Sequence, residues 1–76
     1  MIEIQKANTS PFDKTPLRWW IVTLLDGNKT ADITCSNGHH GLIDQHTIHP
    51  DGTVEPSVVC TEEGCGFHEF IKLIGW

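Results

Sequence analysis

Two short clusters hold every cysteine of this 76-residue chain, and they constrain its fold more than any other feature. The first reads CSNGHH from Cys35, and the second reads CTEEGCG from Cys60 to Gly66. Each places candidate metal ligands a few residues apart beside glycine, which lets the backbone turn tightly around an ion. Three thiolates and one imidazole complete a tetrahedral set. We therefore expect both clusters to meet around one structural metal.

The short length of the chain favours such a metal. Seventy-six residues form one small domain at most, and a domain of this size usually needs a staple besides its apolar core. Three cysteines are an odd number, which suits a set of disulfides poorly. The N-terminal residues show no secretory signal, so we expect a cytoplasmic protein with reduced thiols. Zinc is the ion that we expect.

The fourth ligand is open between two adjacent histidines. His39 follows Cys35 by four positions and His40 by five. We favour His39 because the Asn-Gly turn before it resembles the short loop of an ordinary zinc knuckle, whereas His40 would point to solvent or hydrogen-bond the site. His68, three positions after Cys65, is the least favoured candidate. The predicted ligands are Cys35, His39, Cys60 and Cys65.

The cysteines have two other interpretations. They could be small buried apolar residues, or Cys35 could be a nucleophile activated by His39 or His40. We favour metal binding because all three cysteines lie at glycine-rich turns, and because neither an oxyanion hole nor an orienting third group can be recognised. We therefore expect no enzymatic activity. For His46 and His49 we expect solvent-facing positions in a strand.

The sequence between and before the clusters favours an all-β fold. Residues 18–25 (RWWIVTLL) are rich in β-branched and aromatic side chains, and the turn residues Asp26-Gly27-Asn28 follow them. Residues 30–35 then return as the second strand of a hairpin. Residues 41–49 and 53–60 predict a second hairpin through Pro50-Asp51-Gly52, which would bring Cys60 beside Cys35. Pro56 indicates that its second arm is an edge strand or is bulged.

The two ends of the chain are predicted from weaker patterns. Residues 1–17 are expected to form a short edge strand around Ile2 and Ile4 and then a loop, whose Phe12 could fold back onto the core. Residues 18–76 are expected to form the metal-binding domain. Within it, residues 67–76 are predicted to be a terminal strand packed across both hairpins.

The net charge of the chain limits the classes of partner that it could bind. The formal net charge is −5 with five Lys and Arg, so a nonspecific nucleic-acid clamp is disfavoured, and zinc held by three thiolates would not reverse the sign. No segment is long and apolar enough to span a membrane.

Trp19 and Trp20 are adjacent on a predicted strand, so they point to opposite faces and at least one could contact a protein partner. The basic residues are scattered: Lys6, Lys14, Arg18, Lys29 and Lys72. The residues Glu55, Glu62, Glu63 and Glu69 are expected to be solvated.

CSNGH followed by CTEEGCGFHEF resembles the zinc ribbon family, in which two knuckles at hairpin tips hold one structural zinc beside a small sheet. The resemblance covers about residues 18–76. It implies an all-β zinc ribbon of two hairpins and a C-terminal strand, with Gly66 in the place of the glycine after a knuckle's second ligand. The wider string, from Cys35 through PDGTVEPSVVC to FHEFIKLIGW, is similar to short zinc ribbon proteins of bacteriophages and prophages. The resemblance implies that the zinc ligands of this chain are Cys35, His39, Cys60 and Cys65.

Two departures from the family pattern concern the knuckles. The first ends in histidine where the family usually has cysteine, and the second has four residues between its cysteines where two are commonest. Zinc ribbons bind proteins, bind nucleic acids or stabilise assemblies, so the fold does not choose among these roles. We expect a non-enzymatic module that contacts a protein. Nucleic-acid binding is the first alternative, and a small metal-dependent enzyme is the second.

Overall fold

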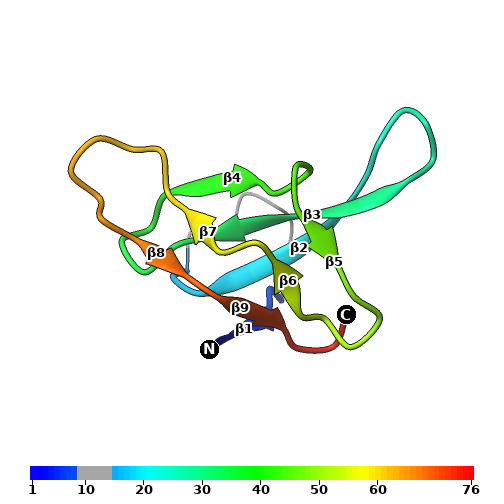
Figure 1. Ribbon diagram of the computed structural model, residues 1–76, viewed down its shortest axis with the longest axis horizontal. Coiled ribbons are helices and arrows are strands. Elements are labelled where there is room, and N and C mark those ends of the chain that lie inside the picture. Colours follow the sequence, from blue (N-terminus) through cyan, green and yellow to red (C-terminus); the bar gives the residue numbers. More distant parts are fainter. Residues whose placement is uncertain (9–14) are drawn as a thin grey trace.

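The computed structural model describes residues 1–8 and 15–76, which form nine β-strands (Figure 1). No helix occurs in these residues, so the predicted all-β class is confirmed. The strands are β1 (Ile2–Lys6), β2 (Arg18–Thr23), β3 (Lys29–Thr34), β4 (His40–Leu42), β5 (Thr47–Ile48), β6 (Val54–Glu55), β7 (Val58–Val59), β8 (His68–Glu69) and β9 (Ile71–Leu73).

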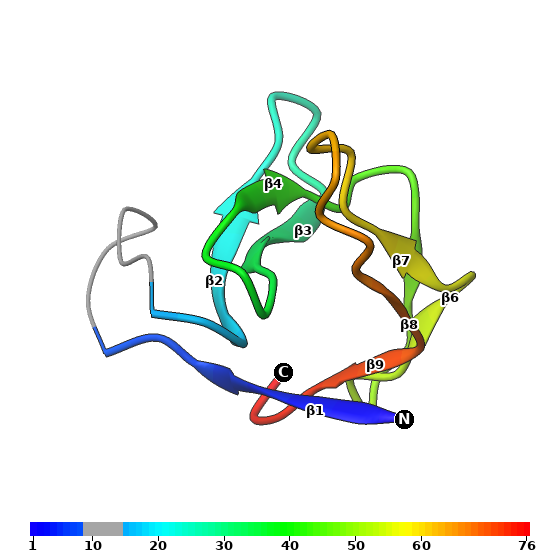
Figure 2. The same cartoon turned by 90° about the vertical axis from the view of Figure 1, so that its left-hand side faces the viewer.

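Five of these strands form one sheet in the order β4-β3-β2-β1-β9. Its β2, β3 and β4 are antiparallel, whereas β1 runs parallel to both β2 and β9. The remaining strands form two short antiparallel pairs, β5-β6 and β7-β8. Figure 2 shows the large sheet curling so that β6, β7 and β8 lie across from β2. The apolar core is enclosed between them.

The first predicted hairpin is confirmed. β2 and β3 pair in register from Arg18 opposite Thr34 to Thr23 opposite Lys29. The first strand ends two residues earlier than we expected, because the amide of Leu24 already donates to the Asn28 carbonyl at 2.7 Å and closes the loop. Gly27 adopts a φ of 88°, which is the left-handed conformation expected of this glycine.

The prediction of an N-terminal edge strand is wrong. β1 lies inside the sheet, between β2 and β9, and the side chain of Ile4 is fully buried. The alternating pattern of Ile2 and Ile4 identifies a strand with one buried face, but it carries no information about neighbours that follow much later in the chain. Residues 9–14, including Phe12 and Lys14, lie outside the described residues, so the expected contact of Phe12 is untested.

The second hairpin is much shorter than predicted. Only β5 and β6 pair across the Pro50-Asp51-Gly52 turn, where Gly52 has a φ of 91°. Residues 40–42 instead extend the first hairpin as β4, and residues 58–59 pair with β8. The reason lies in two interruptions: a turn in which the His46 amide donates to the Ile43 carbonyl, and Pro56, which has no amide hydrogen.

The single terminal strand that we expected is divided at Phe70. β8 pairs with β7, and β9 pairs with β1. The amide of Leu73 also donates to the Gly52 carbonyl at 2.8 Å, which joins β9 to the second turn. This segment therefore connects three parts of the fold, as two strands with different partners rather than as one strand across both hairpins.

The adjacent tryptophans occupy opposite faces of β2, as predicted. Trp19 is 2% exposed, packs in the core beside Trp76 at a ring-centroid distance of 5.5 Å, and donates from Nε1 to the Ile74 carbonyl. Trp20 is half-buried on the other face. The Lys6 ammonium lies 5.4 Å from the Trp19 ring centroid and 5.7 Å from that of Trp20. This cation is therefore already paired with aromatic rings of its own chain.

Candidate metal centre

The first knuckle is the loop between β3 and β4. The Cys35 amide donates to the His39 carbonyl at 2.7 Å, and the Gly38 amide donates to the Cys35 carbonyl at 3.0 Å. Gly38 makes this turn possible with a φ of 84°. The Asn37 amide lies 3.4 Å from the Cys35 sulfur, as a donor to it. The loop thus holds Cys35 and His39 on the same side with an amide directed at the thiol.

The second knuckle connects β7 to β8 and repeats this arrangement. The Cys60 amide donates to the Phe67 carbonyl at 2.9 Å, and the Cys65 amide donates to the Glu62 carbonyl at 3.1 Å. The Glu62 amide donates to the Cys60 sulfur, and the Phe67 amide donates to the Cys65 sulfur. Each of the three thiols therefore accepts a hydrogen bond from the amide two residues later.

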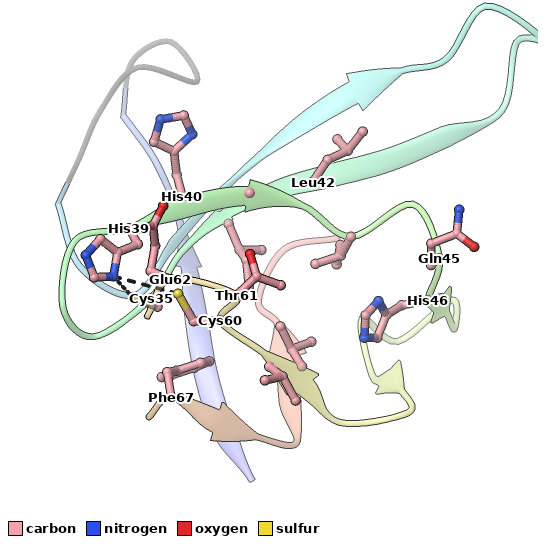
Figure 3. Close-up of a pocket in the computed structure, with 15 residues that line it drawn as sticks. Cys35, His39, His40, Leu42, Gln45, His46, Cys60, Thr61, Glu62 and Phe67 are labelled. Carbon is pink, nitrogen blue, oxygen red and sulfur yellow. Dashed lines mark hydrogen bonds between the residues drawn. The ribbon is translucent and has the colours of Figure 1, made fainter. Parts of the chain in front are cut away.

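The two knuckles bring Cys35, His39, Cys60 and Cys65 together, with their ligand atoms all within 4.8 Å of one another. The sulfurs of Cys35 and Cys65 are 3.6 Å apart, far beyond the S–S bond length of about 2.05 Å. His39 Nδ1 lies 3.8 Å from the Cys35 sulfur and 3.7 Å from the Cys60 sulfur (Figure 3). These four residues could hold a metal ion.

The separations fit a tetrahedral ion. With metal–sulfur bonds of about 2.3 Å and a metal–nitrogen bond of about 2.0 Å, a regular tetrahedron has S–S edges of about 3.8 Å and S–N edges of about 3.5 Å. The distances from Cys35 to Cys65 and from His39 to Cys35 and Cys60 are within a few tenths of an ångström of these edges. The donor set is thus spaced for one small ion.

The electrostatics of the cluster differ between its thiols. Hydrogen bonds from the Asn37 side chain and then from the Phe67 amide lower the pKa of Cys65 to about 6. For Cys60 the Glu62 amide acts in the same direction, but desolvation and the neighbouring thiols of Cys65 and Cys35 outweigh it and raise the pKa. Several thiolates this close repel one another unless a cation lies between them.

Asn37 is the site residue that the sequence analysis missed. Its Nδ2 donates to the Cys65 carbonyl at 3.1 Å and to the Cys65 sulfur at 3.2 Å, so a residue of the first knuckle holds a ligand of the second. The sequence CSNGH assigns Asn37 only to the turn. Its contact with Cys65 depends on the meeting of two loops, which no local pattern encodes.

The other histidines lie outside the cluster. His40 Nδ1 is 3.5 Å from an Asp32 carboxylate oxygen across the strand pair, and His68 Nε2 is 2.7 Å from the Ser57 hydroxyl. The prediction that His46 and His49 are solvent-facing strand residues is wrong about the strand, because His46 precedes β5 and His49 follows it. Both residues are partly buried, and the side chain of His49 is 42% exposed. His46 Nε2 is 3.2 Å from the Ser57 carbonyl oxygen, and His49 Nε2 is 3.2 Å from a Glu55 carboxylate oxygen.

A cleft of about 220 Å³ begins at the metal centre. Figure 3 shows His39 and Cys60 at one end of it and Gln45 and His46 at the other. Its apolar lining includes the buried residues Ile33, Ile43, Val58 and Phe67. The exposed residues Leu42 and Val59 also line it, at 45% and 54% exposure.

No protein-family model, curated protein or solved structure matches this chain. The zinc ribbon resemblance, the phage origin and the cytoplasmic location therefore stay predictions. In residues 1–8 and 15–76 no helix has the length and apolar character needed to cross a membrane. The four predicted acidic surface residues are exposed, as expected: Glu55, Glu62, Glu63 and Glu69.

Proposed function

We propose that this protein is a non-enzymatic interaction module stabilised by one zinc ion, which Cys35, His39, Cys60 and Cys65 hold. The observation that carries the proposal is the convergence of three sulfurs and one imidazole nitrogen within 4.8 Å. Thiolate and imidazole ligands suit zinc, whereas calcium and magnesium prefer oxygen ligands. Zinc would neutralise the crowded thiolates and join the two knuckles.

A structural role follows from the number of ligands. Four protein ligands fill a tetrahedral shell, whereas catalytic zinc sites keep one position for water or substrate. The zinc would instead contribute folding free energy, because it joins two loops that have little regular structure of their own. The interaction role is supported by the exposed apolar side chains of Leu42 and Val59 beside the cleft.

The metal content of purified variants tests the ligand set. The wild-type chain, purified without added metal, is expected to contain one zinc ion by elemental analysis. Serine at Cys35, Cys60 or Cys65 should abolish stoichiometric zinc, because each removal leaves an incomplete shell.

Two histidine variants form a matched pair in this experiment. His39→Ala should lose zinc, whereas His40→Ala should retain it, because His40 faces Asp32 rather than the thiols. His46→Ala should also retain zinc. Equal zinc loss in His39→Ala and His40→Ala, or a wild-type chain that folds without metal, would contradict the proposal.

A further inference from the structure

The cleft beside the metal centre is bordered by a strand with one open edge. β4 pairs with β3, and no other described strand lies beside it. The Ile43 amide donates to the Ala31 carbonyl and the Cys35 amide donates to the His39 carbonyl. Because hydrogen bonds alternate along an antiparallel strand, the backbone groups of His40 and Leu42 point away from β3. These two residues present free donors and acceptors at the edge.

The opposite side of the cleft has a similar edge. β7 pairs with β8, and the Cys60 amide donates to the Phe67 carbonyl. By the same alternation, the backbone N–H and C=O of Val59 point away from β8. Both strands border the cleft, β4 through Leu42 and β7 through Val59. Strand edges of this kind accept an extended peptide as an additional strand.

The charge of the cleft indicates which peptide fits it. No Lys or Arg is found among the lining residues that the structure describes, and Glu62 contributes a carboxylate. The zinc proposed above would leave three thiolates with a net charge of −1, and the whole chain carries a formal charge of −5. A cationic segment is therefore complementary in charge, and apolar side chains are complementary to the floor formed by Ile43 and Val58.

We propose that the β4 edge and its cleft bind an extended segment of a partner protein in which apolar and basic residues alternate, as an added strand along His40–Leu42. This inference rests on the interaction role proposed above and names its surface and partner class. The apolar side chains of the segment would face the cleft, and its backbone would bond to the free groups of His40 and Leu42. A three-residue edge predicts a weak, reversible complex.

The probe is a fluorescein-labelled, capped hexapeptide of alternating lysine and valine, added to the zinc-loaded full chain at low salt. We expect saturable fluorescence anisotropy, with amide shifts in the protein's NMR spectrum confined to residues 40–43 and 58–60. The same peptide with glutamate in place of lysine should bind at least tenfold more weakly. A peptide N-methylated on alternate residues, so that one edge of its backbone lacks donors and is blocked, should not bind through that edge. Two such peptides are compared, each methylated along a different edge of its backbone. The peptide whose methylated edge faces β4 should bind at least tenfold more weakly than the unmethylated peptide.

Leu42→Pro is the decisive protein variant. It removes the outward-facing amide hydrogen of Leu42 without removing a hydrogen bond to β3, so the peptide's affinity should fall at least tenfold. Leu42→Val keeps the amide and is the matched control. Zinc content is measured on each variant, so that loss of the metal centre is distinguished from loss of the edge. The N-methylated peptides test the wild-type chain and do not depend on how a variant folds.

Four outcomes would overturn the inference. They are no saturable binding by a zinc-loaded chain, equal binding of all N-methylated peptides, shifts centred away from β4, and self-association through β4 that excludes the peptide. The last would identify a second copy of this chain as the occupant. If a chain without zinc bound the peptide at β4, the proposal that zinc stabilises the fold would be refuted, whereas the proposal of a peptide-binding edge would be supported.

Discussion

The sheet formed by β1, β2, β3 and β9 and the knuckle layer, which comprises residues 35–39 and 58–69, are stabilised by different means. The sheet has strands of up to six residues and buries Ile4, Ile71 and Leu73 completely. The knuckle layer has two strands of two residues and is otherwise turns around four polar ligands. Apolar burial orders the first region, whereas the second buries the apolar side chains of only Val58 and Phe67 beside its ligands, so we expect it to depend on the metal.

The two regions share a boundary at Cys35, a buried core residue that directly follows β3 and begins the first knuckle. A metal bound there would connect the loops directly to the apolar core. Perturbing one region at a time shows how far it depends on the other.

Removal of the metal should have the largest effect. Structural zinc in small domains is worth about 10–16 kcal/mol at pH 7, which equals or exceeds the stability expected for a domain of this size. We expect the metal-free chain to be largely unfolded or molten. Near-UV circular dichroism of the tryptophans, recorded after chelation and verified metal loss, measures this. A spectrum that stays unchanged would show that the sheet folds without the knuckle layer.

Gly52→Ala should have the next largest effect, and it acts on the sheet. A Cβ at Gly52 would collide with the Leu73 carbonyl, in addition to the strain of a φ of 91°. Gly27→Ala is the matched control, because its φ is 88° but nothing lies within 4 Å of the added Cβ. We expect denaturation of the zinc-loaded chain to show a loss of about 1 kcal/mol for Gly27→Ala and of about 3 kcal/mol for Gly52→Ala. Equal losses would mean that β9 moves away from the turn at little cost.

Asn37→Ala should have the smallest effect and should be confined to the knuckle layer. It removes the side-chain donor to the Cys65 sulfur and carbonyl, so the pKa of that thiol should rise from its lowered value of about 6. Loss of such a supporting contact typically weakens metal affinity about 10–100-fold. Competition with a chromogenic chelator measures the affinity, with Ser36→Ala at the neighbouring exposed residue as control. An unchanged affinity would show that the backbone amides alone orient the thiols.

Much of the metal centre could be predicted because each knuckle is local. Cysteine, histidine and glycine a few residues apart specify a loop with converging ligands, and Gly38 and Gly64 have the left-handed φ that this requires. The first hairpin was predictable for the same reason, since its turn residues lie between two strands that are adjacent in sequence. Asn37 was missed because its partner, Cys65, belongs to the other knuckle.

The sequence by itself determined the all-β class, the first hairpin and the residues offered as ligands, because short-range turn geometry and side-chain chemistry specify all three. Only the tertiary structure decided that β1 lies between β2 and β9, that residues 40–42 extend the first hairpin, and that residues 67–76 divide between two partners. The pairings of β3 with β4 and of β7 with β8 each cross one short loop, whereas those of β1 with β2 and β9 join residues farther apart in the chain. Their free energy comes from burying side chains such as Ile4 and Ile71 against each other, which depends on the whole fold rather than on any local pattern.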